Sequence, residues 1–112
     1  MGEAPWLDLA FAEIAGQEAR RTGVSQVATG PRGFLEAYRR SGGEPEALGY
    51  YSSTESWRTR RNNFVARHMA QVMARQEPLW TASGEPTRRH LALAVWAYSP
   101  TPKAFQDWAW GR

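Results

Sequence analysis

Cysteine is absent from this chain of 112 residues. Its absence excludes disulfide bonds, a thiolate nucleophile and a Cys-ligated metal. Long apolar runs are missing as well, and none approaches the ~20 residues that a membrane-spanning helix requires. The first residues, MGEAPW, lack the basic start and the apolar core of a secretory signal. The sequence therefore predicts a cytoplasmic protein with no membrane partner.

Motifs for catalysis and for cofactor binding are also missing. The sequence has no Gly-rich phosphate loop and no G-x-S-x-G. His68 and His90 do not have the spacing of a metal site. Glu13, Glu18 and Glu36 are the best carboxylate candidates for glycoside hydrolysis, but exposed glutamates on helices are far commoner. We expect no catalytic residues, no metal and no cofactor, and hence no enzyme.

Lysine occurs once, so that arginine supplies thirteen of the fourteen basic residues. Residues 1–56 carry eight acids and five bases, a net charge of −3, whereas residues 57–112 carry three acids and nine bases, a net charge of +6. Arginine is suited to bidentate contact with phosphate or carboxylate. Base composition of a G+C-rich genome would also enrich arginine, but it does not explain the difference between the two halves.

Apolar periodicity and capping residues predict an all-α fold, a compact bundle of about five helices in one domain, residues 1–112. The expected helices span roughly residues 5–21, 31–41, 52–76, 87–98 and 102–110. The fourth is apolar on every face from residue 91 to 98, and a helix of that kind is buried on all sides. We expect it near 88–98 at the centre of the bundle. No segment has convincing strand character.

The third helix is the longest segment without glycine or proline, and Ser52 with Glu55 suggests a capping box at its start. One side of this helix is apolar and should face the core; it carries Trp57, Phe64, Val65, His68, Met69, Val72 and Met73. Arg58 and Arg61 fall within the same arc. Because guanidinium groups do not stay buried without a partner, this end either leaves the core or meets an anion. His68 is interpreted as a core histidine, and Met69 and Met73 as core-filling residues.

The run W-R-x-R-R-N-N-F-x-x-R-H, from Trp57 to His68, is the strongest local signal. A cationic strip beside an asparagine suits contact with phosphates and base edges, and the free amides at the start of the fourth helix could extend it. The residues expected to bind DNA or RNA, or an acidic protein surface, are Arg58, Arg60, Arg61, Asn63, Arg67, Arg88 and Arg89. The alternative is a solvated helix face, with some of these arginines paired to Glu36, Glu44, Glu46 or Glu55.

Two parts of the chain resemble known families. RTRRNNFVARH at 58–68, together with GEPTRRHLALAVW at 84–96, is similar to a motif pair of small basic proteins from phages and large DNA viruses. That resemblance covers roughly a third of the chain and implies a viral or mobile-element setting. PWLDLAFAEIAGQEA followed by GPRGFLEAYRRSGG resembles the first two helices of phage NlpC/CHAP-like amidases. That family requires a nucleophilic cysteine, so the second resemblance implies at most a shared helical scaffold.

Taken together, these features predict a small basic phage-like binding protein that contacts nucleic acid through an arginine-rich helix face. The alternative is a protein-interaction module, either a virion component or an inhibitor that docks on an acidic host protein. The expected location is the host cytoplasm or the virion.

Overall fold

The computed structural model describes residues 3–112, which form five α-helices and one short 3-10 helix. The helices are α1 (Leu9–Thr22), α2 (Phe34–Arg40), α3 (Trp57–Arg75), α4 (Arg88–Val95) and α5 (Pro102–Trp110), and the 3-10 helix is Pro45–Ala47. Over these residues there are isolated bridges between Tyr50 and Ser56 and between Trp80 and Pro86, but no sheet. The predicted all-α bundle is confirmed.

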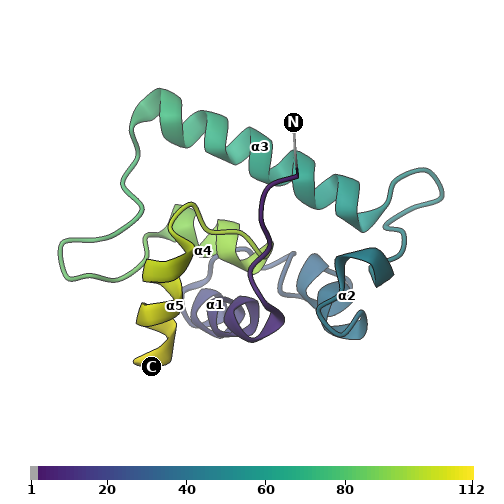
Figure 1. Cartoon of the computed structure of the whole chain (residues 1–112), viewed down its shortest axis with the longest axis horizontal. Helices are drawn as coiled ribbons and strands as arrows, with labels where there is room; N and C mark the ends of the chain where they lie inside the picture. Colours follow the sequence, from purple (N-terminus) through teal and green to yellow (C-terminus); the bar gives the residue numbers. More distant parts are fainter. Residues whose placement is uncertain (1–2) are drawn as a thin grey trace.

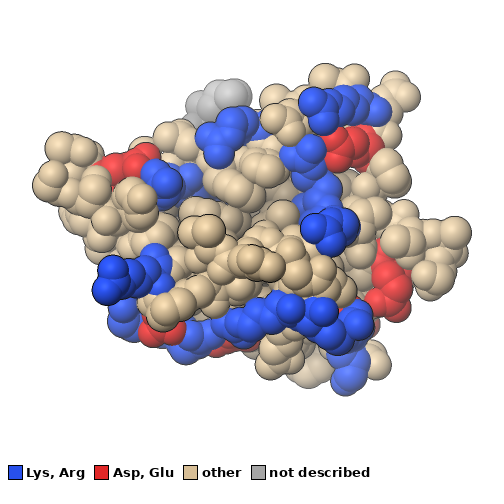
Figure 2. Space-filling model, turned by 180° about the vertical axis from the view of Figure 1, so that it is seen from behind, with Lys and Arg blue, Asp and Glu red and all other residues tan. Residues whose placement is uncertain are grey.

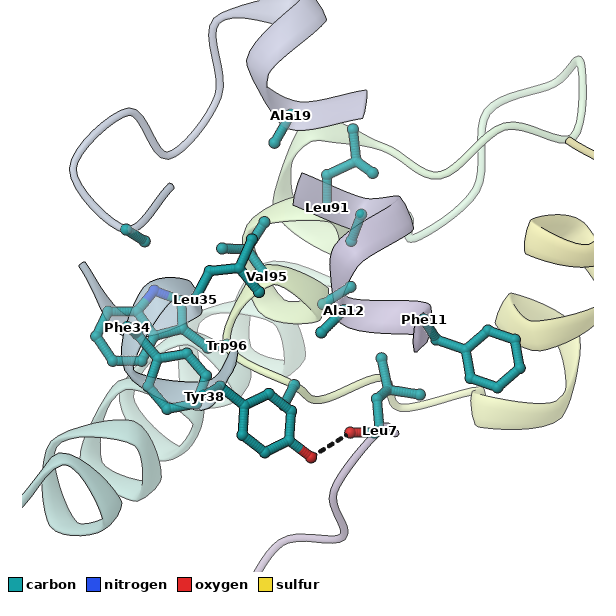
Figure 3. Close-up of a cluster of buried hydrophobic side chains, with 14 of the residues drawn as sticks. Leu7, Phe11, Ala12, Ala19, Phe34, Leu35, Tyr38, Leu91, Val95 and Trp96 are labelled. Carbon is teal, nitrogen blue, oxygen red and sulfur yellow. Dashed lines mark hydrogen bonds between the residues drawn. The ribbon is translucent and has the colours of Figure 1, made fainter. Parts of the chain in front are cut away.

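The core lies between α1 and α4, with α2 closing one end (Figure 1). The contact face of α1 is made mostly of alanines, Ala12, Ala15 and Ala19, which let the backbone of α4 approach closely. Leu91 and Val95 of α4 fill the space between the helices (Figure 3). The expectation of a buried apolar fourth helix is therefore confirmed. Thr87 caps this helix as its sequence suggests, because its hydroxyl accepts from the amide of His90 at 3.3 Å.

Helix α3 crosses one side of the molecule, above α1, α4 and α5 at its C-terminal half and above α2 at its N-terminal half (Figure 1). Its apolar side packs through a stack of aromatic rings. The ring of Phe64 lies 4.6 Å from that of Trp96, and Trp96 lies 4.8 Å from Phe34, both pairs nearly parallel. Met73 does not join this contact and is largely exposed, so its predicted role as a core residue is wrong.

Arg61 fastens the extended N-terminal segment to α3 and α4. Its side chain is 0 % exposed. Its guanidinium donates to the carbonyl oxygens of Ala4 (2.8 Å), Pro5, Trp96 (3.1 Å) and Ala97 (2.9 Å), and to the side chain of Asn62 (2.9 Å). These five bonds match the five N–H donors of a guanidinium.

The same contacts explain two helix ends that the sequence misplaced. Helix α1 begins at Leu9 and not at Pro5, because residues 4–7 are extended: they supply carbonyls to Arg61, and the Leu7 amide donates to Ala97 O at 2.7 Å. Helix α4 ends at Val95 through a left-handed turn at Ala97 (φ 61°), with the Tyr98 amide donating back to the carbonyl of Leu93 at 3.2 Å, and Arg61 caps this end by donating to the carbonyls of Trp96 and Ala97. A cation at a helix C-terminus satisfies unpaired carbonyls and complements the helix dipole.

The predicted capping box at Ser52 is wrong. Helix α3 begins at Trp57, and Ser56 is its cap, with its hydroxyl oxygen 3.1 Å from the amide nitrogen of Thr59. The amides of Tyr51 and Ser52 instead donate to the carbonyl of Glu55, which closes residues 51–55 into a loop ahead of the helix. Helix α2 likewise begins at Phe34 rather than at Pro31.

Candidate functional site

The structure separates six of the seven residues expected to bind a partner into three groups, and Arg88 lies apart from them at the start of α4. Arg61 belongs to the fold and cannot reach a partner, because its side chain is buried and its donors are satisfied within the chain. Burial lowers the pKa of Arg61 to about 10, so the guanidinium still carries its charge at neutral pH. In addition to its carbonyl acceptors, it lies over the ring of Trp6 at 3.9 Å. The expectation that a buried guanidinium needs an anion is therefore wrong here: carbonyl dipoles and an aromatic ring replace it.

Arg58 and Arg89 form the second group, which is neutralised by acids of the same chain. Arg58 makes a two-bond contact with Glu3, with distances of 2.7 and 2.8 Å, and this contact holds the pKa of the Glu3 carboxyl at about 2. Arg89 makes a similar contact with Glu77 at 3.0 and 2.9 Å and also donates to Nδ1 of His68 at 2.7 Å. Both arginines meet carboxylates, as the alternative interpretation of this helix face expects, although the carboxylates are not the ones named for it.

Arg60, Asn63 and Arg67 form the third group, and here the structure brings predicted residues together. With Phe64 and Trp96 they line a hollow of about 200 Å³ on one side of α3. Arg60 is partly engaged: it binds Glu55 at 2.8 Å and lies over the ring of Tyr51 at 3.9 Å. Arg67 is exposed, and within residues 3–112 no carboxylate lies within ion-pair distance of it.

This hollow shares lining residues with two others, and through them it connects to a fourth; together they make one groove between the N-terminal half of α3 and the segment 23–33. The hollow next to it, about 490 Å³, shares Phe64 and Trp96 with it and has Val27 and Ala28 on the opposite wall. Two more extend the groove past Trp57 towards Arg40 and Tyr50, the outer one with a volume of about 600 Å³. Glu55 is the single acidic residue among the described residues that line these hollows.

Three of the five exposed arginines without a carboxylate partner line this groove. Within residues 3–112, the arginines that have no carboxylate within 4.0 Å are the buried Arg61 and the exposed Arg20, Arg32, Arg40, Arg67 and Arg88. Arg32, Arg40 and Arg67 line the groove itself. Figure 2 shows this side of the molecule, with basic side chains ranged around a central uncharged area and few acids between them.

Arg20 and Arg88, the other two exposed arginines without a carboxylate partner, bind backbone carbonyls near the groove. Arg20 donates to the carbonyl of Thr29 at 3.1 Å, and Arg88 donates to the carbonyl of Thr22 at 3.3 Å. Each guanidinium uses only part of its donors in these bonds. Arg20 therefore keeps its charge beside the segment 23–33, and Arg88 keeps its charge beside the last residue of α1.

The groove also exposes apolar surface. Val27 is 87 % exposed and Tyr50 is 72 % exposed, although residues of these types are usually covered. The edge of the Phe64–Trp96 stack reaches the floor of the groove. The groove thus combines unpaired cations, one asparagine and uncovered rings.

Other titratable groups are satisfied within the fold. Glu13 and Glu36 both bind Arg39, and Glu18 binds Arg21 and Arg112. The bond from Arg39 lowers the pKa of Glu13, and the bond from Arg21 lowers the pKa of Glu18. A general acid needs the opposite shift.

A Ser–His pair is also present, but it belongs to the core. His90 Nδ1 lies 2.8 Å from the carbonyl of Leu79, and its Nε2 lies 2.7 Å from Ser99 Oγ. The carbonyl fixes the ring proton on Nδ1, so Nε2 accepts from the serine hydroxyl. Both residues are buried, so no substrate reaches them. His68, stacked on Phe64 at 3.9 Å, is half-buried, and burial lowers the pKa of each histidine.

Metal ligands do not gather anywhere in residues 3–112, which contain no group of three or more metal-ligating side chains placed to hold an ion. Nor does any helix formed by these residues have the length and apolarity needed to cross a membrane.

Reasoning from the sequence missed Arg20, Arg32 and Arg40. They lie in the half of the chain whose net charge is −3, and the overall charge of that half conceals them. The usable signal was local: Arg32 stands between Pro31 and Gly33 with no acid within three positions, whereas Arg39 has Glu36 one helical turn away.

Comparison with known proteins found no matching family model, no matching curated protein and no matching solved structure. The two resemblances noted in the sequence therefore stay predictions.

Proposed function

We propose that this protein binds nucleic acid along the groove between α3 and the segment 23–33. The observation that carries the proposal is that three exposed guanidiniums without a carboxylate partner, those of Arg32, Arg40 and Arg67, line one groove. Apart from Arg20 and Arg88, the other exposed basic side chains of the described chain meet acids, so positive charge is left over mainly here.

A chain of phosphates is the partner that fits this distribution. Its charges repeat along its length, as the guanidiniums do along the groove, and guanidinium binds phosphate in bidentate fashion. Asn63 adds an amide that can donate to and accept from base edges. The outward face of α3 is less suitable than the sequence suggested, because Arg58 is already held by Glu3.

The direct test is a fluorescence-anisotropy titration of labelled mixed-sequence DNA and RNA at about 50 mM salt, where phosphate contacts are strong. Arg67→Gln should weaken binding, since it removes one phosphate contact from the groove. Lys103→Gln is the matched control, because it removes one charge from an exposed ion pair on α5. Absence of binding at this salt concentration, or equal weakening by both variants, would refute the proposal.

A second candidate function is docking on an acidic protein surface, and the exposed Val27 favours it. Nucleic acid has no need of an uncovered aliphatic side chain at the rim of the groove, whereas a protein partner would cover one. The ratio of absorbance at 260 and 280 nm of the purified protein separates the two candidates. Co-purified nucleic acid supports the first, and a stable complex with a protein, free of nucleic acid, supports the second. The setting that goes with either is a host cell infected by a phage, or the virion itself.

A further inference from the structure

The outer hollow of the groove combines cations with an uncovered aromatic ring. It is lined by Val27, Arg32, Arg40, Tyr50, Tyr51 and Trp57, among others, and none of its described lining residues is acidic. Its volume of about 600 Å³ lies within the range of sites for small organic ligands. A ligand that fills it must carry negative charge and present a flat apolar surface.

Tyr51 does not supply the free ring. The guanidinium of Arg60 lies over it at 3.9 Å, and Trp57 meets it edge-on, with ring centres 5.0 Å apart. These contacts fix the orientation of Tyr51. They also leave its neighbour Tyr50 as the ring that is exposed and that, within residues 3–112, has no aromatic or cationic partner.

Arg32 and Arg40 lie in the same hollow as the ring of Tyr50. Both side chains are exposed and free of carboxylates within the described chain. Their guanidiniums can take the phosphates on either side of a nucleotide whose base lies on Tyr50. The arrangement is the combination of a stacking surface and a cationic track found where proteins bind single strands.

We infer that this hollow is the site for one unpaired nucleotide, and that the protein prefers single-stranded nucleic acid to a duplex. In a duplex the faces of the bases are covered by their neighbours, so a tyrosine ring has nothing to stack on. The inference rests on the proposed function and adds to it the kind of strand that is bound and the residue that selects it.

The test compares Tyr50→Ala with Tyr50→Phe, which keeps the ring, and with Trp110→Ala. Trp110 is another exposed aromatic residue, at the end of α5. Oligothymidylate and oligouridylate of about 12 nucleotides cover the length of a typical single-strand site, and a hairpin duplex is the competitor. Circular dichroism of each variant checks that the fold is retained.

Tyr50→Ala should weaken binding of the single strands about tenfold, the loss expected for one stacked base. Tyr50→Phe should bind as the parent does, and neither Trp110→Ala nor binding of the duplex should respond.

If Tyr50→Ala binds single strands as the parent does while Arg67→Gln weakens them, the nucleotide site is wrong and the proposed function survives. Equal affinity for the duplex overturns the inference in the same way. If no nucleic acid binds but a glutamate-rich peptide does, both the inference and the proposed function fail, and the groove is a protein-docking surface.

Discussion

Replacing Arg61 should damage stability and spare binding, although this residue stands in the middle of the arginine-rich motif. In Arg61→Ala the buried carbonyl of Trp96 is left without a donor, at about 1–3 kcal/mol, whereas the carbonyl of Ala97 keeps its bond from the Leu7 amide. The N-terminal segment also loses its anchor to α3. We expect the free energy of unfolding to fall by about 4 kcal/mol in total. That is a large fraction of the roughly 5–15 kcal/mol by which a typical domain is stable.

Arg61→Lys keeps the positive charge but not the planar guanidinium group. An ammonium group at the same place can reach one or two of the carbonyls, so this variant should lose about 2 kcal/mol. Urea denaturation followed by tryptophan fluorescence measures both losses, because Trp6 and Trp96 lie beside Arg61. Arg58→Lys is the control: it alters an exposed ion pair one turn away and should change the stability far less than either Arg61 variant.

Two results would refute this reasoning. One is a loss below about 1 kcal/mol for Arg61→Ala, which would mean that the carbonyls find other donors or water at little cost. The other is a folded Arg61→Lys protein whose affinity for nucleic acid falls as much as that of Arg67→Gln. In that case Arg61 would be a contact residue after all.

Three further perturbations test other contacts of the fold. Glu3→Gln should destabilise the protein by about 1 kcal/mol at pH 7, a figure reduced for solvent screening of this half-exposed pair. Arg58 lowers the pKa of folded Glu3 to about 2, so the carboxylate contributes to stability above its unfolded pKa of 4.5, and this contribution disappears as the pH falls towards 2. If the free energies of unfolding of the parent and of Glu3→Gln differ as much at low pH as at pH 7, this reasoning is wrong. Burial lowers the pKa of folded His90 below its unfolded value of 6.5, so its contribution is present above pH 6.5 and is lost on acidification. The melting temperature of His90→Gln should therefore change less than that of the parent between pH 7 and pH 5. Equal changes in the two proteins would contradict this account. In Gly33→Ala the added Cβ would overlap the carbonyl oxygen of Val27, so we expect a loss of about 1–3 kcal/mol together with weaker nucleic-acid binding, measured by denaturation and by anisotropy; unchanged affinity would show that this wall of the groove is not used.

Patterns within single helices were sufficient to predict most of the fold. The apolar run from Leu91 to Val95, the cap at Thr87 and the proline at position 102 all depend on neighbours in sequence, and the structure has each of them. The prediction for Met73 was wrong because periodicity places a residue on a face but does not say how far the facing helix extends.

Contacts between distant segments were beyond the reach of the sequence. Within the sequence of one helix, an anion is the expected partner of a buried arginine. Arg61 instead donates to four carbonyls of distant segments, those of residues 4, 5, 96 and 97. The groove escaped prediction for the same reason. Arg32 and Arg40 precede α3 by many residues, and only the packing of the segment 23–33 beside Phe64 and Trp96 makes them part of one surface.

The salt dependence of binding tests the central claim most directly. Affinity of the parent protein for a single strand should fall as the salt concentration rises. Replacing three groove arginines together, in the variant Arg32→Gln, Arg40→Gln and Arg67→Gln, should reduce the slope of log K against log salt by about 2, because each phosphate that the protein neutralises adds about 0.7 to that slope. Lys103→Gln should leave the slope unchanged. A slope that is the same in the parent and in the triple variant would show that the groove does not bind phosphates, and the account would be wrong.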